Sequence, residues 1–447
     1  MGKASFTATK TLKNYANGGN VLLMTTALAL IIVNIPGLTG FYNSLWTHEI
    51  ALQVGKFNLF SHHGEPMSIM AFINDALMAV FFFSVGLEIK REVLVGELSS
   101  FRSAILPIIA AIGGMGVPVL IFSIMAEGTP YAGGAAIPMA TDIAFSLGVL
   151  AMLGSRVPVS LKIFLTTLAV VDDIGGILVI AIFYSSHINL TLILIALGLL
   201  AILAFGGLFR IQSKIFYLGI GAFVWFLFLN AGIHPTIAGV LIAFCVPAKP
   251  VFAPKKYIKT IRKDINLFSH EDEEKLVSKT ILTKEQMNWL KEIESASDKV
   301  ISPLQDLEDS LHPVVNYFII PIFAFANAGI YLGDLHLASV VQGLSLAIII
   351  GLVAGKFIGI FGFTYLAVKL RLADLPEGTD WKMIASVSLL GGIGFTVALF
   401  IANLSFGSGD PILSQLLNNA KLGIVVGSLL AGIGGYLCLH FSLPKKK

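Results

Sequence analysis

Charged residues are scarce in this chain. Lys, Arg, Asp and Glu make up 13% of its 447 residues, while 56% are hydrophobic and the mean hydropathy is +0.85. Soluble globular chains carry about 25% charged residues, and burial in one large aqueous core cannot account for such a deficit over this length. A lipid bilayer can, because lipid replaces water as the solvent of the side chains. The deficit therefore excludes a soluble globular protein and predicts a polytopic membrane protein.

Residues that form disulfides or bind transition metals are also few. The two cysteines, Cys245 and Cys438, lie in apolar runs and form neither a disulfide framework nor a metal-binding spacing. The sequence has no cluster of His and Cys to hold a transition metal. The net charge of +3 does not indicate nucleic acid, since membrane topology explains where the basic residues stand. We therefore expect neither a cofactor nor a nucleic-acid partner.

Long apolar runs take up most of the chain. A helix needs about 20 apolar residues to cross a bilayer, and the sequence offers twelve such runs. The first follows Lys3, Lys10 and Lys13 with no small-residue cleavage site after it, so we interpret it as an uncleaved helix. The 44 glycines suit the close approach of helices in lipid. The twelve predicted spans are 18–36, 69–89, 104–126, 131–153, 161–184, 188–209, 214–230, 232–247, 314–332, 340–368, 383–404 and 418–441.

The positions of Lys and Arg indicate how these spans are oriented. With both termini in the cytoplasm, 27 of the 30 Lys and Arg fall in inner segments. The other three are Lys56 in an outer loop, Lys421 at the start of the last span and Lys356 within a span. Because short loops rich in Lys and Arg stay in the cytoplasm, this distribution predicts a multi-pass protein of the bacterial inner membrane with both chain ends inside.

Residues 45–60 differ from the apolar runs. Their apolar residues alternate on either side of Gly55-Lys56, a pattern typical of two strands joined by a turn that begins with glycine. The segment lies between the first two spans, on the outer side. We expect a small outer β-hairpin that pairs with a second subunit, and a plain loop is the alternative.

Residues 248–312 form the one long charged segment. They are expected to be a solvated cytoplasmic linker. Within it, Thr283 and Gln286 match a capping box ahead of a short amphipathic helix. The chain is thus expected to be a single transporter domain, with spans in 18–247 and 314–441 joined by this linker.

Four charged residues lie deep inside predicted spans, where an ionisable group is costly and indicates a function. Asp142 is the twelfth residue of the fourth span, and Asp172 and Asp173 are the twelfth and thirteenth of the fifth. Lys356 lies too far from the inner end of its span for the amine to reach the interface, and Asp75 lies nearer the outer end of the second. A single acid could make only a structural hydrogen bond. Three acids and a lysine at matching depth predict an ion site.

Asp172 and Asp173 are expected to have different roles. Adjacent residues on a helix point about 100° apart, so the two carboxylates cannot share one ligand well. One is expected to face Asp142 across the helix interface, and the other to meet Lys356, the only buried cation available. The spacing alone leaves open which acid does which.

Two spans are interrupted near their middle. In the fourth, Pro138 stands four residues before Asp142, and proline removes a backbone donor and kinks a helix. In the eleventh, Gly391, Gly392 and Gly394 stand near the midpoint. Such breaks survive at membrane depth where the backbone lines a cavity or packs against protein. Spans three to five and ten to twelve are expected to form inverted repeats, with broken helices at the fourth and eleventh spans.

The chemistry of the predicted site suits a small alkali cation. Carboxylates, the hydroxyl of Thr141 and carbonyl groups freed by a break are hard oxygen ligands, which suit Na⁺ or Li⁺ rather than soft metals. Carboxylates close together in a low dielectric also hold protons more tightly. Protons and Na⁺ would then compete for the same oxygens. Such competition is sufficient for antiport if the loaded forms switch sides and the empty charged form does not.

Several runs of the sequence closely resemble the NhaA family of sodium/proton antiporters. The similarity covers about residues 15–443 and rests on many motifs. It implies an all-α membrane protein with two crossed, broken helices and with inverted repeats, for which NhaA is itself a known example. The runs are FINDALMAVFFFSVGLEIKRE (72–92), PMATDIAFSLGVLAMLGSRVP (138–158), LKIFLTTLAVVDDIGGILVIAIFY (161–184), LHPVVNYFIIPIFAFANAG (311–329), GKFIGI (355–360), LPEGT (375–379) and LLGGIGFTVALFIANLSF (389–406).

The resemblance also implies roles for single residues. Asp142 would lie at the crossing of the broken helices and Asp173 would bind the cation, while Asp172 would pair with Lys356. Electrogenic exchange of Na⁺ or Li⁺ for protons, activation at alkaline pH and a homodimer held by the outer hairpin are implied as well.

A response to pH is expected from four further residues. Glu88 and Glu92 stand one turn apart at the inner end of the second span, Glu308 precedes the ninth, and His234 matches a family histidine, although the Pro235 that follows is unusual. In the family the inner funnel is tied to the pH response. Ordinary interfacial charges are the alternative.

Two other classes of protein compete with an antiporter. An intramembrane aspartyl protease also places two aspartates on neighbouring helices, but this sequence has no GxGD run, and a protease has no use for a buried lysine. A sodium-coupled symporter of an organic solute would need a solute pocket beside the cation site. Collapse of a pH gradient by NaCl alone, without an organic solute, distinguishes antiport from symport.

Overall fold

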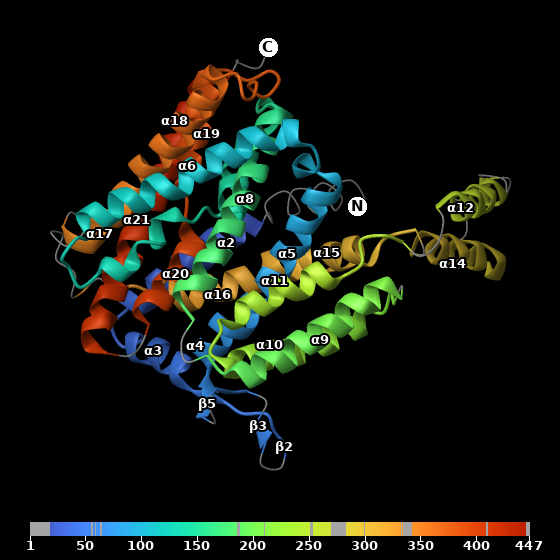
Figure 1. The fold of residues 1–447 in the computed structure, drawn as a ribbon, viewed down its shortest axis with the longest axis horizontal. Coiled ribbons are helices and arrows are strands. Elements are labelled where there is room, and N and C mark those ends of the chain that lie inside the picture. The colour runs from blue at the N-terminus through green and yellow to red at the C-terminus, as the bar shows by residue number, and fades with distance from the viewer. Residues whose placement is uncertain are drawn as a thin grey trace, which may run out of the picture.

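The structure is a computed structural model of the chain. Figure 1 shows a bundle of long helices from which a unit of two short helices stands apart. Described are residues 18–443 except 55–56, 59, 63–64, 186–187, 210, 251–253, 270–282, 299, 332, 334–341 and 408–409.

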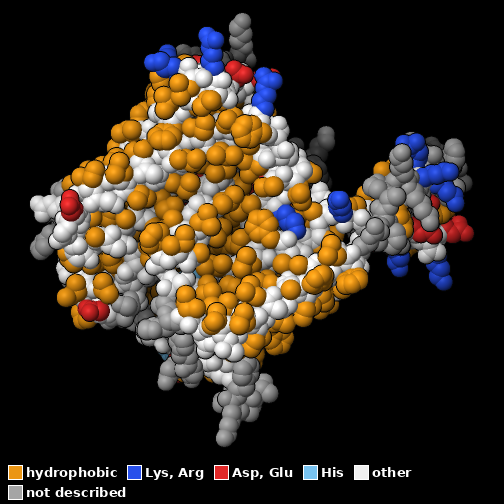
Figure 2. Space-filling view, viewed as in Figure 1, with side chains coloured by type: hydrophobic (Ala, Val, Ile, Leu, Met, Phe, Trp, Pro, Cys, Tyr) orange, Lys and Arg blue, Asp and Glu red, His pale blue; other side chains and the backbone are white. Residues whose placement is uncertain are grey.

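Nine helices of the described residues are long and apolar enough to cross a membrane. Two bent pairs raise the number to eleven if each pair is one span: α2 (Gly18–Asn34) with α3 (Thr39–Thr47), bent by 115°, and α19 (Trp381–Leu390) with α20 (Phe395–Phe406), bent by 41°. Apolar side chains cover the visible face of the bundle in Figure 2, as a lipid-facing surface requires. The nine are Ile69–Val95, α6 (Phe101–Met125), Ala132–Met152, α8 (Val159–Phe183), α9 (Leu190–Leu208), α10 (Lys214–Ala231), Pro303–Asn327, Gly343–Lys369 and α21 (Pro411–Ser442).

Eleven of the predicted spans overlap these helices in chain order, but the described residues do not confirm a count of twelve. The predicted eighth span is only the eleven-residue helix α11 (Pro235–Cys245). At 1.5 Å per residue it is about 16 Å long, well short of the hydrocarbon core. The ninth span begins at Pro303 rather than 314, because Ser302 caps it by accepting a hydrogen bond from the backbone N of Gln305 at 3.3 Å. The linker therefore ends earlier than predicted.

Three spans contain a π-helical turn, a feature that is frequent at functional sites. Each turn carries or adjoins a polar residue of the membrane interior: Asn74 and Asp75 in the second span, Asn316 in the ninth and Lys356 after the third turn. The turns are Ile73–Leu77 between α4 (Ile69–Phe72) and α5 (Met78–Val95), Val315–Ile319 between α15 (Pro303–Val314) and α16 (Ile320–Asn327), and Gly351–Gly355 between α17 (Gly343–Ile350) and α18 (Lys356–Lys369).

Helices α6 and α18 pack backbone against backbone. A Cβ atom on Gly359 would lie 2.1 Å from the carbonyl oxygen of Gly113, and one on Gly113 would lie 2.4 Å from the carbonyl oxygen of Gly359. Only glycine at both positions permits this approach, as is common between helices in lipid. The contact holds α18, and Lys356 one turn away, firmly against α6.

The predicted hairpin within residues 45–60 is confirmed as two short paired strands. Strands β2 (Gln53–Val54) and β3 (Phe57–Asn58) pair antiparallel, with Val54 opposite Phe57, and the Gly55-Lys56 turn lies outside the described residues. Figure 1 shows the pair projecting from the bundle. Sequence reasoning did not foresee a second antiparallel sheet at its base, of order β1-β5-β4, formed by β1 (Glu49–Ile50), β4 (Ser61–His62) and β5 (Glu65–Ser68).

The described part of the linker forms two helices that pack together, α12 (Pro254–Ser269) and α14 (Lys284–Asp298). The predicted capping box is confirmed: the backbone N of Gln286 donates to Thr283 Oγ1 at 3.2 Å, and Gln286 Oε1 accepts from the backbone N of Thr283 at 2.9 Å. The pair, called the linker unit below, is the one that stands apart in Figure 1.

Candidate functional site

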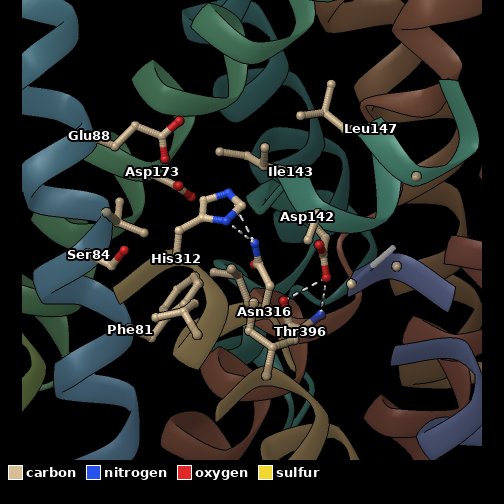
Figure 3. Close-up of a pocket in the computed structure, with 18 of the residues that line it drawn as sticks. Phe81, Ser84, Glu88, Asp142, Ile143, Leu147, Asp173, His312, Asn316 and Thr396 are labelled. Atoms are coloured by element: carbon tan, nitrogen blue, oxygen red, sulfur yellow. Dashed lines mark hydrogen bonds between the residues drawn. The ribbon is translucent and has the colours of Figure 1, made fainter. Parts of the chain in front are cut away.

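A cavity of about 360 Å³ lies within the helix bundle. Figure 3 shows carboxyl, hydroxyl, amide and imidazole groups around it, contributed by several helices. Two of the three acids that the sequence predicted at mid-span, Asp142 and Asp173, therefore face the same space. Its polar lining residues include Ser84, Glu88, Thr141, Asp142, Asp173, His312, Asn316 and Thr396.

Asp142 is the N-terminal cap of α7 (Ile143–Met152). Pro138 lies in a 3-10 turn just before it, and the backbone is extended at Asp142, with φ −91° and ψ 103°. Its Oδ1 accepts a hydrogen bond from the backbone N of Phe145 at 3.0 Å. Its Oδ2 accepts from the backbone N of Thr396 at 3.0 Å and from the Thr396 hydroxyl at 2.6 Å. The carboxylate, 2% exposed, thus lies at the N-terminal ends of two helices, α7 and α20, which favour negative charge.

The two interrupted spans meet at their breaks. Both breaks were predicted, and both are present as non-helical backbone, before α7 and between α19 and α20. The backbone N of Asp142 donates to the carbonyl oxygen of Ile393 at 2.6 Å, and Thr141 Oγ1 donates to the carbonyl oxygen of Gly391 at 2.9 Å. Carbonyl groups released by one break are thus satisfied by donors from the other, as buried backbone requires.

The glycines of the second break are needed for close packing rather than for an unusual backbone angle. Gly391 and Gly394 have φ of −60° and −96°, which any residue adopts. A Cβ atom on Gly392 would, however, lie 2.2 Å from the carbonyl oxygen of Leu352, in the π-helical turn before Lys356. These glycines therefore allow the break to lie directly against the lysine-bearing span.

Asp172 and Lys356 form a buried ion pair. Lys356 Nζ lies 2.6 Å from Asp172 Oδ2 and donates a second hydrogen bond to Thr141 Oγ1 at 2.9 Å. The residues are 3% and 0% exposed, and within the described chain Asp172 Oδ1 is buried with no hydrogen-bond partner. The geometry therefore assigns Asp172 to the lysine, an assignment that the spacing had left open.

Asp173, the next residue along α8, faces the cavity instead. It is 6% exposed, and within the described residues it has no hydrogen bond or ion pair. In Figure 3 its carboxyl group lies on the same side of the cavity as that of Glu88, and Asp142 lies across from both. The two adjacent acids thus point in different directions, Asp172 towards Lys356 and Asp173 into the cavity, because successive residues of a helix are rotated by about 100°.

Sequence reasoning missed several polar residues of the cavity, among them Thr396, His312 and Asn316. Thr396 makes two hydrogen bonds to Asp142, and the side chains of His312 and Asn316 lie 3.1 Å apart, one helical turn from each other. A signal for Thr396 was available: it is the second residue after the glycine run, so its hydroxyl stands at the start of a helix in mid-membrane. His312 and Asn316 had no comparable signal, since histidine near the end of a span is ordinary.

Three of the four residues predicted to respond to pH lie together. Arg91 Nη1 lies 3.0 Å from Glu92 Oε1, and Arg91 Nε lies 2.9 Å from Glu308 Oε1. Glu88, one turn before Glu92 on α5, lines the cavity together with Asp173. The glutamates therefore connect the cavity to an ionic cluster between α5 and α15.

The fourth, His234, lies apart from this cluster. Its Nδ1 is 2.8 Å from Thr236 Oγ1, its Nε2 is 3.8 Å from Asp75 Oδ1, and its ring contacts that of Phe400 at 5.3 Å. Asp75 and Glu88 are thirteen residues apart on one span, or about 20 Å at the helical rise. The structure thus gives His234 contacts at the Asp75 end of that span rather than with the glutamates.

Three asparagines, called the asparagine row below, connect three spans on the hairpin side of the cavity. Asn327 Nδ2 donates to Asn74 Oδ1, and Asn403 Nδ2 donates to Asn327 Oδ1, both at 2.9 Å. Asn327 is 0% exposed. Each asparagine stands seven residues, or about 10 Å of helix, from a cavity-lining residue of its own span. Those three lining residues are Phe81, Ile320 and Thr396.

Comparison with known proteins confirms the resemblance seen in the motifs. A family model described as Na⁺/H⁺ antiporter 1 matches residues 9–439. The Na⁺/H⁺ antiporter NhaA of Phocaeicola vulgatus is 56% identical over 432 residues, covering 97% of this chain and 95% of the relative. That of Bacteroides fragilis is 53% identical over 446 residues, covering 99% and 100%. A Na⁺/H⁺ antiporter named NhaA 2, from Syntrophotalea carbinolica, is 44% identical over 436 residues, covering 97% and 96%.

Proposed function

This chain belongs to the NhaA family of Na⁺/H⁺ antiporters, and we propose that it exchanges Na⁺ or Li⁺ for protons at Asp142 and Asp173. The observation that carries this proposal is that two buried carboxylates from different spans line one cavity, together with the hydroxyls of Thr141 and Thr396. Hard oxygen ligands of this kind suit a small alkali cation, and carboxylates also accept protons. The two substrates therefore compete for the same atoms.

The two acids would share the exchange unequally. Asp173 carries no hydrogen bond within the described residues and is free to coordinate a cation, whereas Asp142 already accepts three hydrogen bonds. When one monovalent cation replaces two protons at such a pair, the exchange moves one net charge and is electrogenic. The ion pair of Asp172 with Lys356 lies directly behind, and Thr141 bridges it to the broken spans.

The wider architecture follows from the same proposal. Twelve segments, with α11 as the short eighth and both chain ends inside, suit the concentration of Lys and Arg in inner loops. The two breaks that meet at Asp142 support inverted repeats, since such repeats bring broken helices together at a midplane site. The paired strands β2 and β3 offer edges through which two copies could join in a homodimer. The protein would then expel sodium across the bacterial inner membrane.

Everted vesicles test the exchange. A pH gradient, acid inside, should collapse when NaCl or LiCl is added without any organic solute, and acridine orange fluorescence should recover. Recovery that requires an organic solute would indicate symport and contradict the proposal. Vesicles lacking the protein serve as the control for passive leakage.

The asparagine row provides the outer seal of the cavity in this arrangement. For exchange to be coupled, a cavity that opens on the glutamate side must be closed on the hairpin side. The row crosses three spans at that level, and Asn327 makes hydrogen bonds to both of its neighbours. These bonds must part when the site opens outwards.

Replacing Asn327 with leucine is therefore expected to open the outer side. Cys245 and Cys438 are first replaced by serine and Phe81, which lines the cavity, by cysteine. In right-side-out vesicles, labelling by a membrane-impermeant thiol reagent should then rise several-fold with Asn327→Leu. The matched control is Asn418→Leu, at an exposed position. If Asn327→Leu leaves the labelling unchanged and lowers the melting temperature, the asparagine row contributes only to packing and does not seal the cavity.

The glutamate cluster is proposed to adjust activity to pH. Glu88→Gln with Glu92→Gln is expected to move the acid limb of the activity profile even at saturating Na⁺, because Glu88 lines the cavity and Glu92 pairs with Arg91 beside it, so the changes alter the charge next to the cation site. Competition between H⁺ and Na⁺ alone predicts a limb that moves only with Na⁺ concentration. The matched control is the double change of two exposed glutamates of α14, Glu285→Gln with Glu292→Gln. If the acid limb of the double variant stays in place at saturating Na⁺, Glu88 and Glu92 do not adjust the activity to pH.

A further inference from the structure

Helix α12 of the linker unit is rich in basic residues. The sequence of α12, PKKYIKTIRKDINLFS, contains five Lys or Arg and one acid. That acid, Asp264, is 2% exposed, whereas Lys259, Arg262 and Lys263 are exposed. Burial of Asp264 leaves the described surface of α12 with positive charge alone.

Exposed isoleucines lie among these basic side chains. Ile258 and Ile265 are 48% and 51% exposed and stand seven residues apart, so they share one face of the helix. Arg262 lies four residues after the first and three before the second, so it belongs to the same face. A helix that exposes apolar and basic residues together has the pattern of helices that lie in the interface of a membrane.

The rest of the molecule is a poor partner for this surface. Several acids at the end of the bundle nearest the linker unit, namely Glu92, Asp306 and Glu308, already form ion pairs with Arg91 or Lys214. Figure 2 shows Lys and Arg both at the edge of the bundle and on the unit. These paired acids are therefore not available to the basic residues of α12. Anionic phospholipid headgroups are complementary to α12 instead, and Lys or Arg close to such a surface are strongly attracted to it.

The unit is also tethered beside the bilayer at both ends. Helix α12 begins nine residues after α11 ends at Cys245, and α15, which starts a membrane span, begins five residues after α14 ends at Asp298. We propose that α12 lies on the anionic surface of the membrane, with Ile258 and Ile265 among the headgroups and Lys259, Arg262 and Lys263 against lipid phosphates. This contact with lipid is separate from ion exchange. It can be tested without knowing on which side of the membrane the linker unit lies, if the vesicles have the same lipids in both leaflets.

A spin label tests the contact in the full-length chain. With Cys245 and Cys438 replaced by serine, a nitroxide is attached at Ile258→Cys, and the protein is reconstituted in phosphatidylcholine, with or without phosphatidylglycerol. Phosphatidylglycerol should lower collision of the label with an aqueous nickel complex several-fold and raise its collision with oxygen, and high salt should reverse both changes. A label at Glu294→Cys, an exposed site on α14, should stay accessible to the nickel complex throughout.

Charge variants separate lipid binding from packing. Lys259→Gln, Arg262→Gln and Lys263→Gln together should lower the bound-to-free ratio of α12 about a hundredfold in vesicles that contain phosphatidylglycerol. The matched control, Lys259→Arg with Arg262→Lys and Lys263→Arg, should leave it unchanged. Equal accessibility of the label at position 258 with and without phosphatidylglycerol would overturn the proposal. So would a label shielded equally in phosphatidylcholine and in detergent, since the face would then be packed on protein.

Discussion

Asp173→Asn is expected to abolish Na⁺/H⁺ exchange while the protein still folds. The carboxylate is buried, lines the cavity and has no hydrogen bond within the described residues, so an amide removes its charge without breaking a contact. Asp142→Asn should have the same effect on exchange, but with a cost in stability. Asp142 Oδ2 accepts a hydrogen bond from the backbone N of Thr396, and an amide group placed there would set a donor against a donor.

Recovery of acridine orange fluorescence in everted vesicles measures the loss, and melting in detergent reports folding. Asp374→Asn is the matched control, since that side chain is 93% exposed and far from any span interior. It should exchange normally. If the double variant Asp142→Asn, Asp173→Asn still restores fluorescence on addition of NaCl, the exchanging site lies elsewhere in the protein.

Lys356→Ala is expected to destabilise the protein and to impair or uncouple exchange. Removing the amine leaves Asp172 charged and buried with both oxygens unpaired, and breaking one partner of a buried pair typically costs about 3–5 kcal/mol. Thr141 also loses a hydrogen bond beside the broken spans, so the damage would extend to the ion site. The melting temperature should therefore fall clearly.

A double-mutant cycle isolates the pair. Asp172→Asn added to Lys356→Ala should recover part of the lost stability, because the buried uncompensated charge is then gone. Lys369→Ala, an exposed lysine on the same helix, should have little effect on its own. Losses that are purely additive in the cycle would contradict an energetic link between Asp172 and Lys356.

Local pattern was enough to predict several features at the level of single residues. The β2–β3 hairpin follows from alternation around Gly55-Lys56, and the capping box of α14 follows from the spacing of Thr283 and Gln286. In each case the interacting residues lie within a few positions of one another, so the sequence already brings them together. The same reasoning failed for the start of the ninth span, because the charged first turns after Ser302 do not look like part of a membrane helix.

The sequence by itself predicted which charged residues lie deep in the spans, because charge is costly in lipid and few positions within the spans carry a charged side chain. That constraint alone selected Asp142, Asp172, Asp173 and Lys356, and the family motifs agreed. Only the tertiary structure decided in which direction around its helix axis each of these side chains points. Lys356 pairs with Asp172, which is 184 residues away in the sequence, and Thr396 donates a hydrogen bond to Asp142, which is 254 residues away. Such contacts depend on how the helices rotate and pack, and glycines such as Gly359 and Gly392 decide this by how closely two backbones approach. Local spacing contains no record of that rotation.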